Sequence, residues 1–332
     1  MSRIGITTTI PIEIIYAAGM VPVDLNNIFI TSTDPLKLIS IAEEAGFPRN
    51  TCGWIKGIYG AITTNPDIKT IIAVTEGDCS NTHALAEIAE LIGKEVVYFS
   101  YPIDKDKTML QYQMHKLMSY FGISDSQAIS VKKRLDKIRQ LAWKIDQMTW
   151  KGNISGKDNH YFLVNCSDMK GNPDLYKKEL LLFINNQLQQ TSASHSKKND
   201  KIRIGIIGVP PIFPDFFEYI ESLNTHIVYN EIPRQFSMPF HTNNLIEQYL
   251  AYTYPYGIFQ RLSDIKTQIT NRKIDGVIHY VQAFCFRHIE DIIVRQELSC
   301  PVLTIEGDTP INIDARTRIR IETFIQILKD AK

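Results

Sequence analysis

The chain has 332 residues, of which 44% are hydrophobic and 22% are charged, and its 36 Lys and Arg residues balance its 36 Asp and Glu residues. This length predicts two domains, and the zero net charge argues against a nucleic-acid-binding protein, which usually carries a basic excess or a basic stripe. Apolar stretches such as 180–184 are far shorter than the roughly 18–20 residues of a membrane span, so we expect no membrane partner.

The N-terminal segment 1–20 is apolar enough to be mistaken for a signal peptide. Pro11 and Glu13 interrupt its apolar run, and no clear cleavage motif follows. We interpret this segment as a strand followed by a helix, and we expect a cytoplasmic protein. The five cysteines are odd in number and widely spaced, so reduced thiols, some of them ligands, are a better interpretation than a disulfide framework.

Short β-rich runs alternate with amphipathic helical stretches near both ends of the chain, which predicts mostly parallel sheets covered by helices. In the first part, strands are predicted at 3–10, 21–25, 69–75 and 96–99, and helices at 12–18, 35–45, 52–62 and 81–92. In the last part, strands are predicted at 202–209, 226–229, 276–281 and 301–305, and helices at 214–223, 245–252, 259–271, 286–297 and 315–328. The tripeptide Glu-Gly-Asp follows a strand in each part, at 76–78 and 306–308, which hints at two similar units.

The β signal nearly vanishes between 104 and 191, where the stretch 125–150 carries apolar residues at helical spacing. The stretch 192–200 is small and polar, as linkers are. We therefore predict an α/β protein with two Rossmann-like or flavodoxin-like parallel-sheet domains, one at 1–103 and one at 201–332. A helical insert at 104–191 and a linker at 192–200 separate the two domains.

Three cysteines lie at places where α/β proteins bind ligands. Cys79 and Cys285 each follow a predicted strand and precede a predicted helix, and Cys52 begins a helical stretch. Ligands bind outside the carboxyl ends of parallel strands, and a helix N-terminus stabilises thiolates and anionic clusters. Because Cys52 and Cys79 belong to the first predicted domain and Cys285 to the second, the three cysteines predict a site between the domains.

Three thiolates suit either a [4Fe–4S] cluster with one open iron or a Cys₃ zinc site with a fourth ligand. The spacing does not decide between them, because the chain has no C-x-x-C motif. From spacing alone, three structural cysteines are the simpler interpretation, since free cysteine is among the most buried residue types. We assign Cys166, in the helical middle, and Cys300, at the N-terminal end of a predicted strand, to that structural class.

Several stretches of the chain resemble the 2-hydroxyacyl-CoA dehydratase D-component family. They are GITTTIPIEIIYAAGMVPVDL at 5–25, TCGWIKGIYGAI at 51–62, TEGDCSNTHALAEIAE at 75–90, IDGVIHYVQAFC at 274–285, CPVLTIEGD at 300–308 and RTRIRIETFIQIL at 316–328. The IYAAGMVPV element, the AFC at a strand end, and the terminal EGD followed by RTRIRIETF are together fairly specific. The resemblance covers roughly residues 4–103 and 202–330, whereas the helical middle is not distinctive.

The resemblance implies that Cys52, Cys79 and Cys285 ligate one [4Fe–4S] cluster. Dehydratases of this family are heterodimers of related subunits, so we expect a dimer, either with a related subunit or with a second copy. The resemblance further implies a separate ATP-hydrolysing iron–sulfur activator that injects one low-potential electron. That electron reduces the thioester of a 2-hydroxyacyl-CoA substrate to a ketyl radical anion, which expels the hydroxyl group. The ketyl is needed because the β-hydrogen of the thioester is not acidic and its hydroxyl lies on the wrong carbon for ordinary elimination.

Departures from the family pattern leave alternatives open. The chain looks shorter than many family dehydratase subunits, and no CoA-binding signature stands out. Related family members are reductases, and some carry a double-cubane cluster, which would need more thiolates than the five cysteines of this chain. The alternatives are an ATP-coupled iron–sulfur reductase that acts on a small substrate, and a non-catalytic cluster carrier or electron-transfer protein.

Three further residues are candidates for catalysis. Glu76, at the strand end near Cys79, could position substrate or act as an acid or base together with Asp78. The alternative there is turn chemistry, with Asp78 as the N-cap of the next helix. His83 could donate a proton near the cluster, although solvated or packed histidines are commoner. Arg261 begins a predicted helix and could reach the interdomain cleft.

Overall fold

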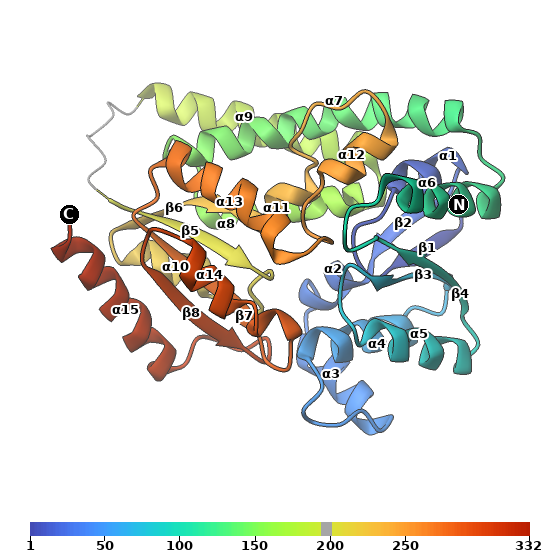
Figure 1. Cartoon of the computed structure of the whole chain (residues 1–332), viewed down its shortest axis with the longest axis horizontal. Helices are drawn as coiled ribbons and strands as arrows, with labels where there is room; N and C mark the ends of the chain where they lie inside the picture. Colours follow the sequence, from blue (N-terminus) through green and yellow to red (C-terminus); the bar gives the residue numbers. More distant parts are fainter. Residues whose placement is uncertain (194–200) are drawn as a thin grey trace.

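Two four-stranded parallel sheets form the framework of the computed structural model, which describes residues 1–193 and 201–332 (Figure 1). The first sheet has the strand order β2-β1-β3-β4 and the second has the order β6-β5-β7-β8, so the two sheets share one topology. The strands are β1 (Arg3–Ile6), β2 (Val21–Asp24), β3 (Ile68–Glu76), β4 (Glu95–Ser100), β5 (Ile202–Gly208), β6 (Thr225–Asn230), β7 (Gly276–Gln282) and β8 (Val302–Gly307). The predicted α/β class with two Rossmann-like or flavodoxin-like units is therefore confirmed.

Helices cover both sheets, and the segment of the chain between the two sheets is helical. The helices of the first half are α1 (Ile12–Ala17), α2 (Leu25–Ile30), α3 (Pro35–Glu44), α4 (Gly53–Thr64) and α5 (Thr82–Leu91). The middle of the chain forms α6 (Lys107–Phe121), α7 (Asp125–Trp150), α8 (Gly156–Val164), the short 3₁₀ helices η1 (Asn165–Ser167) and η2 (Met169–Gly171), and α9 (Pro173–Ala193). The second half has α10 (Phe216–Ser222), α11 (Glu231–Phe236), α12 (Leu245–Ala251), α13 (Ile258–Arg272), η3 (Phe286–His288), α14 (Asp291–Glu297) and α15 (Ala315–Asp330). Within the described ranges, no helix combines the length and apolarity that a membrane crossing requires.

The predicted linker at 192–200 begins inside α9, and its residues 194–200 lie outside the part of the chain that the structure describes. The boundaries at 103, 191 and 201 stay predictions. The repeated Glu-Gly-Asp tripeptide does not mark the similarity of the two halves. One copy ends β3, the third strand of its sheet, whereas the other lies on β8, the fourth strand of its sheet.

The sequence does not predict α2 and α11, which occupy matching places in the two halves. Each begins at the residue that follows an edge strand, so β2 runs directly into α2 and β6 runs directly into α11. Asp24 caps α2, because its carboxylate accepts the Asn26 backbone N–H at 2.9 Å. No turn residues separate strand from helix at either place, and sequence patterns detect an element boundary mainly through such residues.

Helix α7 ties the middle of the chain to both halves. It has 26 residues and is therefore about 39 Å long, and it runs along the molecule over both halves (Figure 1). Its Arg139 pairs with Glu13 of α1 at 2.7 Å, and its Asp146 accepts two hydrogen bonds from Arg272 of α13. These groups are buried, so separating either pair would leave an unpaired charge in the interior. The ion pairs therefore fix the helical insert against both halves.

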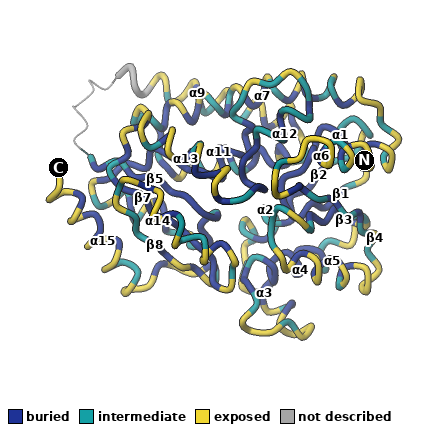
Figure 2. The backbone as a smooth tube through the Cα atoms, in the orientation of Figure 1, coloured by how far each residue is buried: buried dark blue, intermediate teal, exposed yellow. Residues whose placement is uncertain are grey.

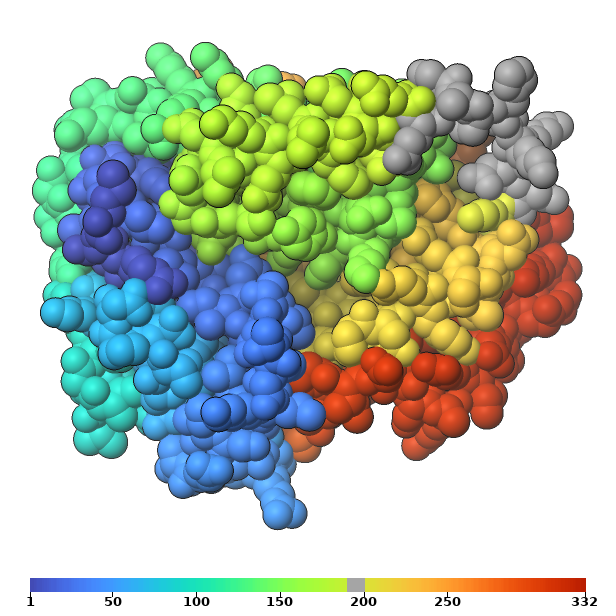
Figure 3. Space-filling view, turned by 180° about the vertical axis from the view of Figure 1, so that it is seen from behind, coloured from blue at the N-terminus to red at the C-terminus, as the bar shows by residue number. Residues whose placement is uncertain are grey.

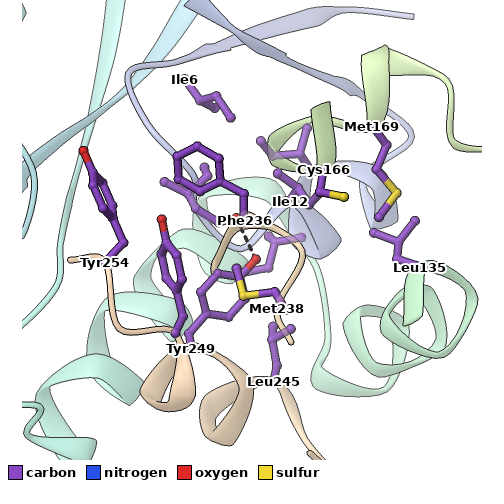
Figure 4. Packing of buried hydrophobic residues seen from close by; sticks show 14 of the residues in the cluster. Ile6, Ile12, Leu135, Cys166, Met169, Phe236, Met238, Leu245, Tyr249 and Tyr254 are labelled. Atoms are coloured by element: carbon purple, nitrogen blue, oxygen red, sulfur yellow. Dashed lines mark hydrogen bonds between the residues drawn. The ribbon is translucent and has the colours of Figure 1, made fainter. Parts of the chain in front are cut away.

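Two of the hydrophobic clusters cross the boundaries between these parts of the chain. One cluster joins Ile6 of the first sheet with Leu135 of α7 and Tyr249 of α12 (Figure 4). A second cluster joins Phe29 of α2 with Ile204 of the second sheet. Figure 2 shows buried backbone from one half to the other, with exposed residues on the outer turns of helices such as α3 and α15. A pocket between the halves therefore has walls that are packed on both sides.

Candidate metal centre and its pocket

A pocket of about 930 Å³, counting its open mouth, lies where the two halves and the helical insert meet. Its lining includes Cys52 and Cys79 of the first half, Cys285 of the second half, and His160 of α8 in the insert. Figure 3 shows a hollow on the rear face, bordered by the blue N-terminal segment, the green helical segment and the yellow segment of the second half. The structure thus brings together the three cysteines that the sequence singles out.

Cys52 is held at the N-cap of α4 and is only 5% exposed. A glycine follows it because α4 starts against the second half of the chain. A Cβ at Gly53 would lie 2.3 Å from the backbone oxygen of Asp308, closer than real Cβ contacts allow. One turn later, a Cβ at Gly57 would collide with the ring of Phe29. The two glycines therefore let α4 approach its neighbours closely enough to place Cys52 between the halves.

Cys79 and Cys285 occupy topologically equivalent places. Cys79 follows β3 and Cys285 follows β7, and each of these strands is the third in the order of its sheet. The predicted helix at 286–297 is interrupted, because this stretch is the three-residue η3 followed by a separate α14 that ends at the predicted residue, Glu297. The helix after Cys79 begins only at Thr82, with Asn81 as its N-cap. Cys52 is therefore the N-cap of an α-helix and Cys285 the N-cap of the three-residue η3, whereas Cys79 is placed by a strand end alone.

Burial raises the pKa of all three thiols. The pKa of Cys52 rises to about 11, against the lowering effect of the Ile55 and Trp54 backbone N–H groups. Burial is also the main reason why the pKa of Cys79 lies well above its ordinary value, and the negative charges of Asp78, Cys52 and Cys285 raise it further. The pKa of Cys285 is raised by burial against the backbone N–H and the positive charge of Arg287. Since these thiolates would repel one another, a cation that binds all three would stabilise them together.

In the metal-free protein, we expect Cys52 to be alkylated slowly and to gain reactivity with pH. The thiolate is the nucleophile, and a pKa of about 11 leaves on the order of one thiol in ten thousand ionised at pH 7. The ionised fraction, and with it the alkylation rate, should rise about tenfold per pH unit between pH 7 and pH 9. Iodoacetamide labelling followed by peptide mass spectrometry measures this rate, and a plateau above pH 8.5 would contradict the expectation.

The three cysteines do not close around a single ion. Among residues 1–193 and 201–332, no group of three or more His, Cys, Asp or Glu side chains is placed to hold one metal ion. A tetrahedral zinc with Zn–S bonds of about 2.3 Å would need sulfur atoms only about 3.8 Å apart. A cluster with a different iron behind each sulfur accepts thiolates that are further apart. Three thiols from both halves line one pocket, and thiolates are the ligands that iron–sulfur clusters use.

Cys166 and Cys300 lie away from the pocket lining. Cys166 is 1% exposed in η1, and its sulfur lies 3.4 Å from the Tyr176 hydroxyl. Figure 4 shows it packed among core side chains that include Ile12 and Met169. Cys300 precedes β8 and packs with a cluster of the second half at the opposite end of that sheet from Cys285. Both are placed as structural cysteines.

The other candidates from the sequence lie outside the pocket lining. Glu76 is exposed, and its carboxylate accepts the Ile103 backbone N–H at 3.4 Å. His83 is exposed on the first turn of α5. Arg261 is 1% exposed and makes a two-pronged ion pair with Glu231, at 2.8 Å and 3.0 Å. Arg261 is therefore engaged inside the second half and does not reach the cleft.

Asp78 lines the pocket, and its interpretation as a helix cap is wrong, because Asn81 occupies the N-cap position of α5. Its carboxylate accepts the Tyr254 hydroxyl at 3.0 Å. Burial raises the pKa of Asp78 to about 6, against the lowering effect of the Arg287 charge and the Tyr254 hydrogen bond. Arg287 in turn donates to the Tyr254 backbone oxygen at 3.0 Å and lies over its ring. These contacts connect the loop that carries Cys79 to the loop that carries Cys285.

Two of the lining residues that the sequence analysis did not single out are titratable groups from edge strand β2 and from the insert. Asp24 ends the edge strand β2, and its burial raises its pKa against hydrogen bonds from Ser167 and Asn26. The rule that sites lie at the carboxyl ends of strands could have indicated Asp24. His160 comes from α8 of the insert, and its Nδ1 is buried with no hydrogen-bond partner. No local pattern marks His160, because its place depends on how the insert packs against both halves.

The chain matches a known protein family over nearly its whole length. The family model described as 2-hydroxyglutaryl-CoA dehydratase, D-component, matches residues 7–328, which is nearly the full chain and includes the helical middle. A search of curated proteins gave no significant match. The resemblance inferred from the cysteine-bearing stretches is confirmed, and the chain belongs to the 2-hydroxyglutaryl-CoA dehydratase D-component family.

Proposed function

We propose that the chain is an iron–sulfur subunit of a 2-hydroxyacyl-CoA dehydratase-like enzyme, in which Cys52, Cys79 and Cys285 hold one [4Fe–4S] cluster. The observation that carries the proposal is that these three cysteines, remote in sequence, line one pocket between the halves. Family membership supports the dehydratase class. An ATP-hydrolysing activator that supplies single electrons, and a related subunit or second copy as dimer partner, belong to the same proposal.

The residues of the pocket suit the handling of a small acyl thioester. When bound, the cluster would supply one-electron chemistry and an iron that can act as a Lewis acid. The apolar lining, which includes Ile55, Ile58 and Phe236, excludes water from the acyl group. Asp78 and Tyr254 share a hydrogen bond at the pocket wall and can hold a proton at the Asp78 carboxyl.

Anaerobic purification followed by iron and acid-labile sulfide analysis tests the proposal. We expect about four irons and four sulfides per chain, with a broad absorption band near 400 nm that bleaches in air. Protein that emerges without metal is reconstituted anaerobically with ferrous iron and sulfide before the same analysis. A stoichiometric zinc, or failure to take up iron after reconstitution, would contradict the cluster.

A further inference from the structure

We infer that the pocket accepts 2-hydroxyacyl groups with an uncharged, apolar tail and rejects those whose tail ends in a second carboxylate. The inference rests on the proposed function for one point only, namely that the ligand is an acyl thioester. It concerns the part of the pocket that remains beyond the three cysteines. The charge of that lining, and not its shape, distinguishes the two kinds of tail.

The lining offers almost no positive charge. Two carboxyl groups, those of Asp24 and Asp78, face the pocket, and Arg287 is the single Lys or Arg among the described residues that line it. Arg287 is 3% exposed and already engaged, because it donates to the Tyr254 backbone oxygen at 3.0 Å and pairs with Glu290 at 3.5 Å. No uncommitted cation therefore faces an incoming carboxylate.

Helix α2, helix α8 and the loop after β5 contribute no Asp, Glu, Lys or Arg to the lining. Helix α2 contributes Asn27 and Ile30, helix α8 contributes His160 and Val164, and the loop after β5 contributes residues 209–211. Burial lowers the pKa of His160 to about 4, so its imidazole is uncharged at neutral pH. The tail of a bound acyl group thus meets aliphatic side chains, prolines, an amide and a neutral imidazole.

The physical consequence follows from the cost of burying an unpaired charge. A carboxylate that leaves water for this pocket loses its hydration and gains no cation in return. An aliphatic tail of the same shape loses no hydration of this kind, and its burial is favourable in proportion to the apolar area removed from water. The lining therefore discriminates by charge between two tails of equal size.

Equilibrium dialysis under anaerobic conditions tests the inference with two shape-matched ligands. In 2-hydroxyglutaryl-CoA the tail ends in a carboxylate, and in 2-hydroxy-5-methylhexanoyl-CoA an isopropyl group takes its place. No electron donor is added, so neither thioester is reduced. We expect the isopropyl ligand to bind more tightly by about tenfold or more. Equal or tighter binding of the glutaryl ligand overturns the inference, and so does failure of both thioesters to bind more tightly than free CoA.

A charge placed in the neutral wall gives the matched control. Asn27 is half-buried on α2 and lines the pocket, so Asn27→Lys should narrow or reverse the preference, whereas Asn27→Gln should keep it. Unchanged selectivity in Asn27→Lys would overturn the inference. Iron analysis of the same samples separates the two proposals: selectivity without iron contradicts only the cluster, and iron without selectivity contradicts only the assignment of the acyl tail.

Discussion

Replacing Cys52, Cys79 or Cys285 by serine should each remove most of the iron from the anaerobically reconstituted protein. A serine hydroxyl is a poor ligand for cluster iron, which is held by thiolates. With three protein ligands available, loss of one leaves the cluster attached through two, so we expect less than about half of the wild-type iron and a matching loss of the band near 400 nm. Cys79→Ser and Cys285→Ser should behave alike, since the two residues follow equivalent strands.

The remaining cysteines of the chain are the controls for this series. Cys300→Ser changes a partly buried residue outside the pocket, and Cys166→Ser changes a core residue whose new hydroxyl can still hydrogen-bond with its surroundings. Both variants should keep the iron content of the wild type. Circular dichroism of all five variants separates loss of the cluster from loss of the fold. Equal iron loss in a control variant that remains folded, or full iron retention in any of the three pocket variants, would overturn the ligand assignment.

The second large effect is expected at Arg261, whose replacement by methionine should destabilise the protein by about 3 kcal/mol. The variant would leave the carboxylate of Glu231, which is 1% exposed, without its ion-pair partner, and it would remove an ion-pair partner of Glu290. It would also remove the hydrogen bond from Arg261 to the backbone oxygen of Gly208, which precedes the pocket-lining loop after β5. Calorimetry of the metal-free protein should show a Tm lower by roughly 5 °C.

Helix α13 itself supplies the matched control for Arg261. Lys266 lies on the same helix and pairs with Glu297 at 2.6 Å, but both partners are exposed. Exposed ion pairs contribute little, so Lys266→Met should leave the Tm nearly unchanged. Arg261→Met combined with Glu231→Gln should recover part of the lost stability, because the stranded charge is then gone. If the double variant is no more stable than Arg261→Met, burial of charge is not the cause.

Local patterns in the sequence are sufficient to identify most of the framework. The eight strands lie at predicted positions because parallel strands appear as short, nearly continuous apolar runs. Helix α7 has the predicted bounds, since 26 residues give the helical period many repeats. Helices α2 and α11 were missed because nothing separates them from the strands before them. The break between η3 and α14 was missed because the residues around it are neither glycine nor proline.

The site was predictable only where it follows from topology. Cys79 and Cys285 could be placed at strand ends, and Cys52 at a helix start, from the order of elements alone. The positions of His160 and Arg261 could not be inferred in this way. The first is brought to the pocket by an insert held through long-range pairs such as that of Arg139 with Glu13. Arg261 points into the second half because it pairs with Glu231 of α11, thirty residues earlier in the chain.

The equivalent placement of Cys79 and Cys285 on the two sheets has a mechanical consequence. A rigid inorganic core bound to both sulfur atoms would act as a cross-link between the halves. A disulfide acts in the same way, because it reduces the conformational entropy of the unfolded chain. Oxidative loss of that core would then remove the cross-link between the halves as well as the group that transfers electrons. Damage by oxygen would be visible as a loosening of the molecule, in protease sensitivity around the pocket mouth, even before any substrate is offered.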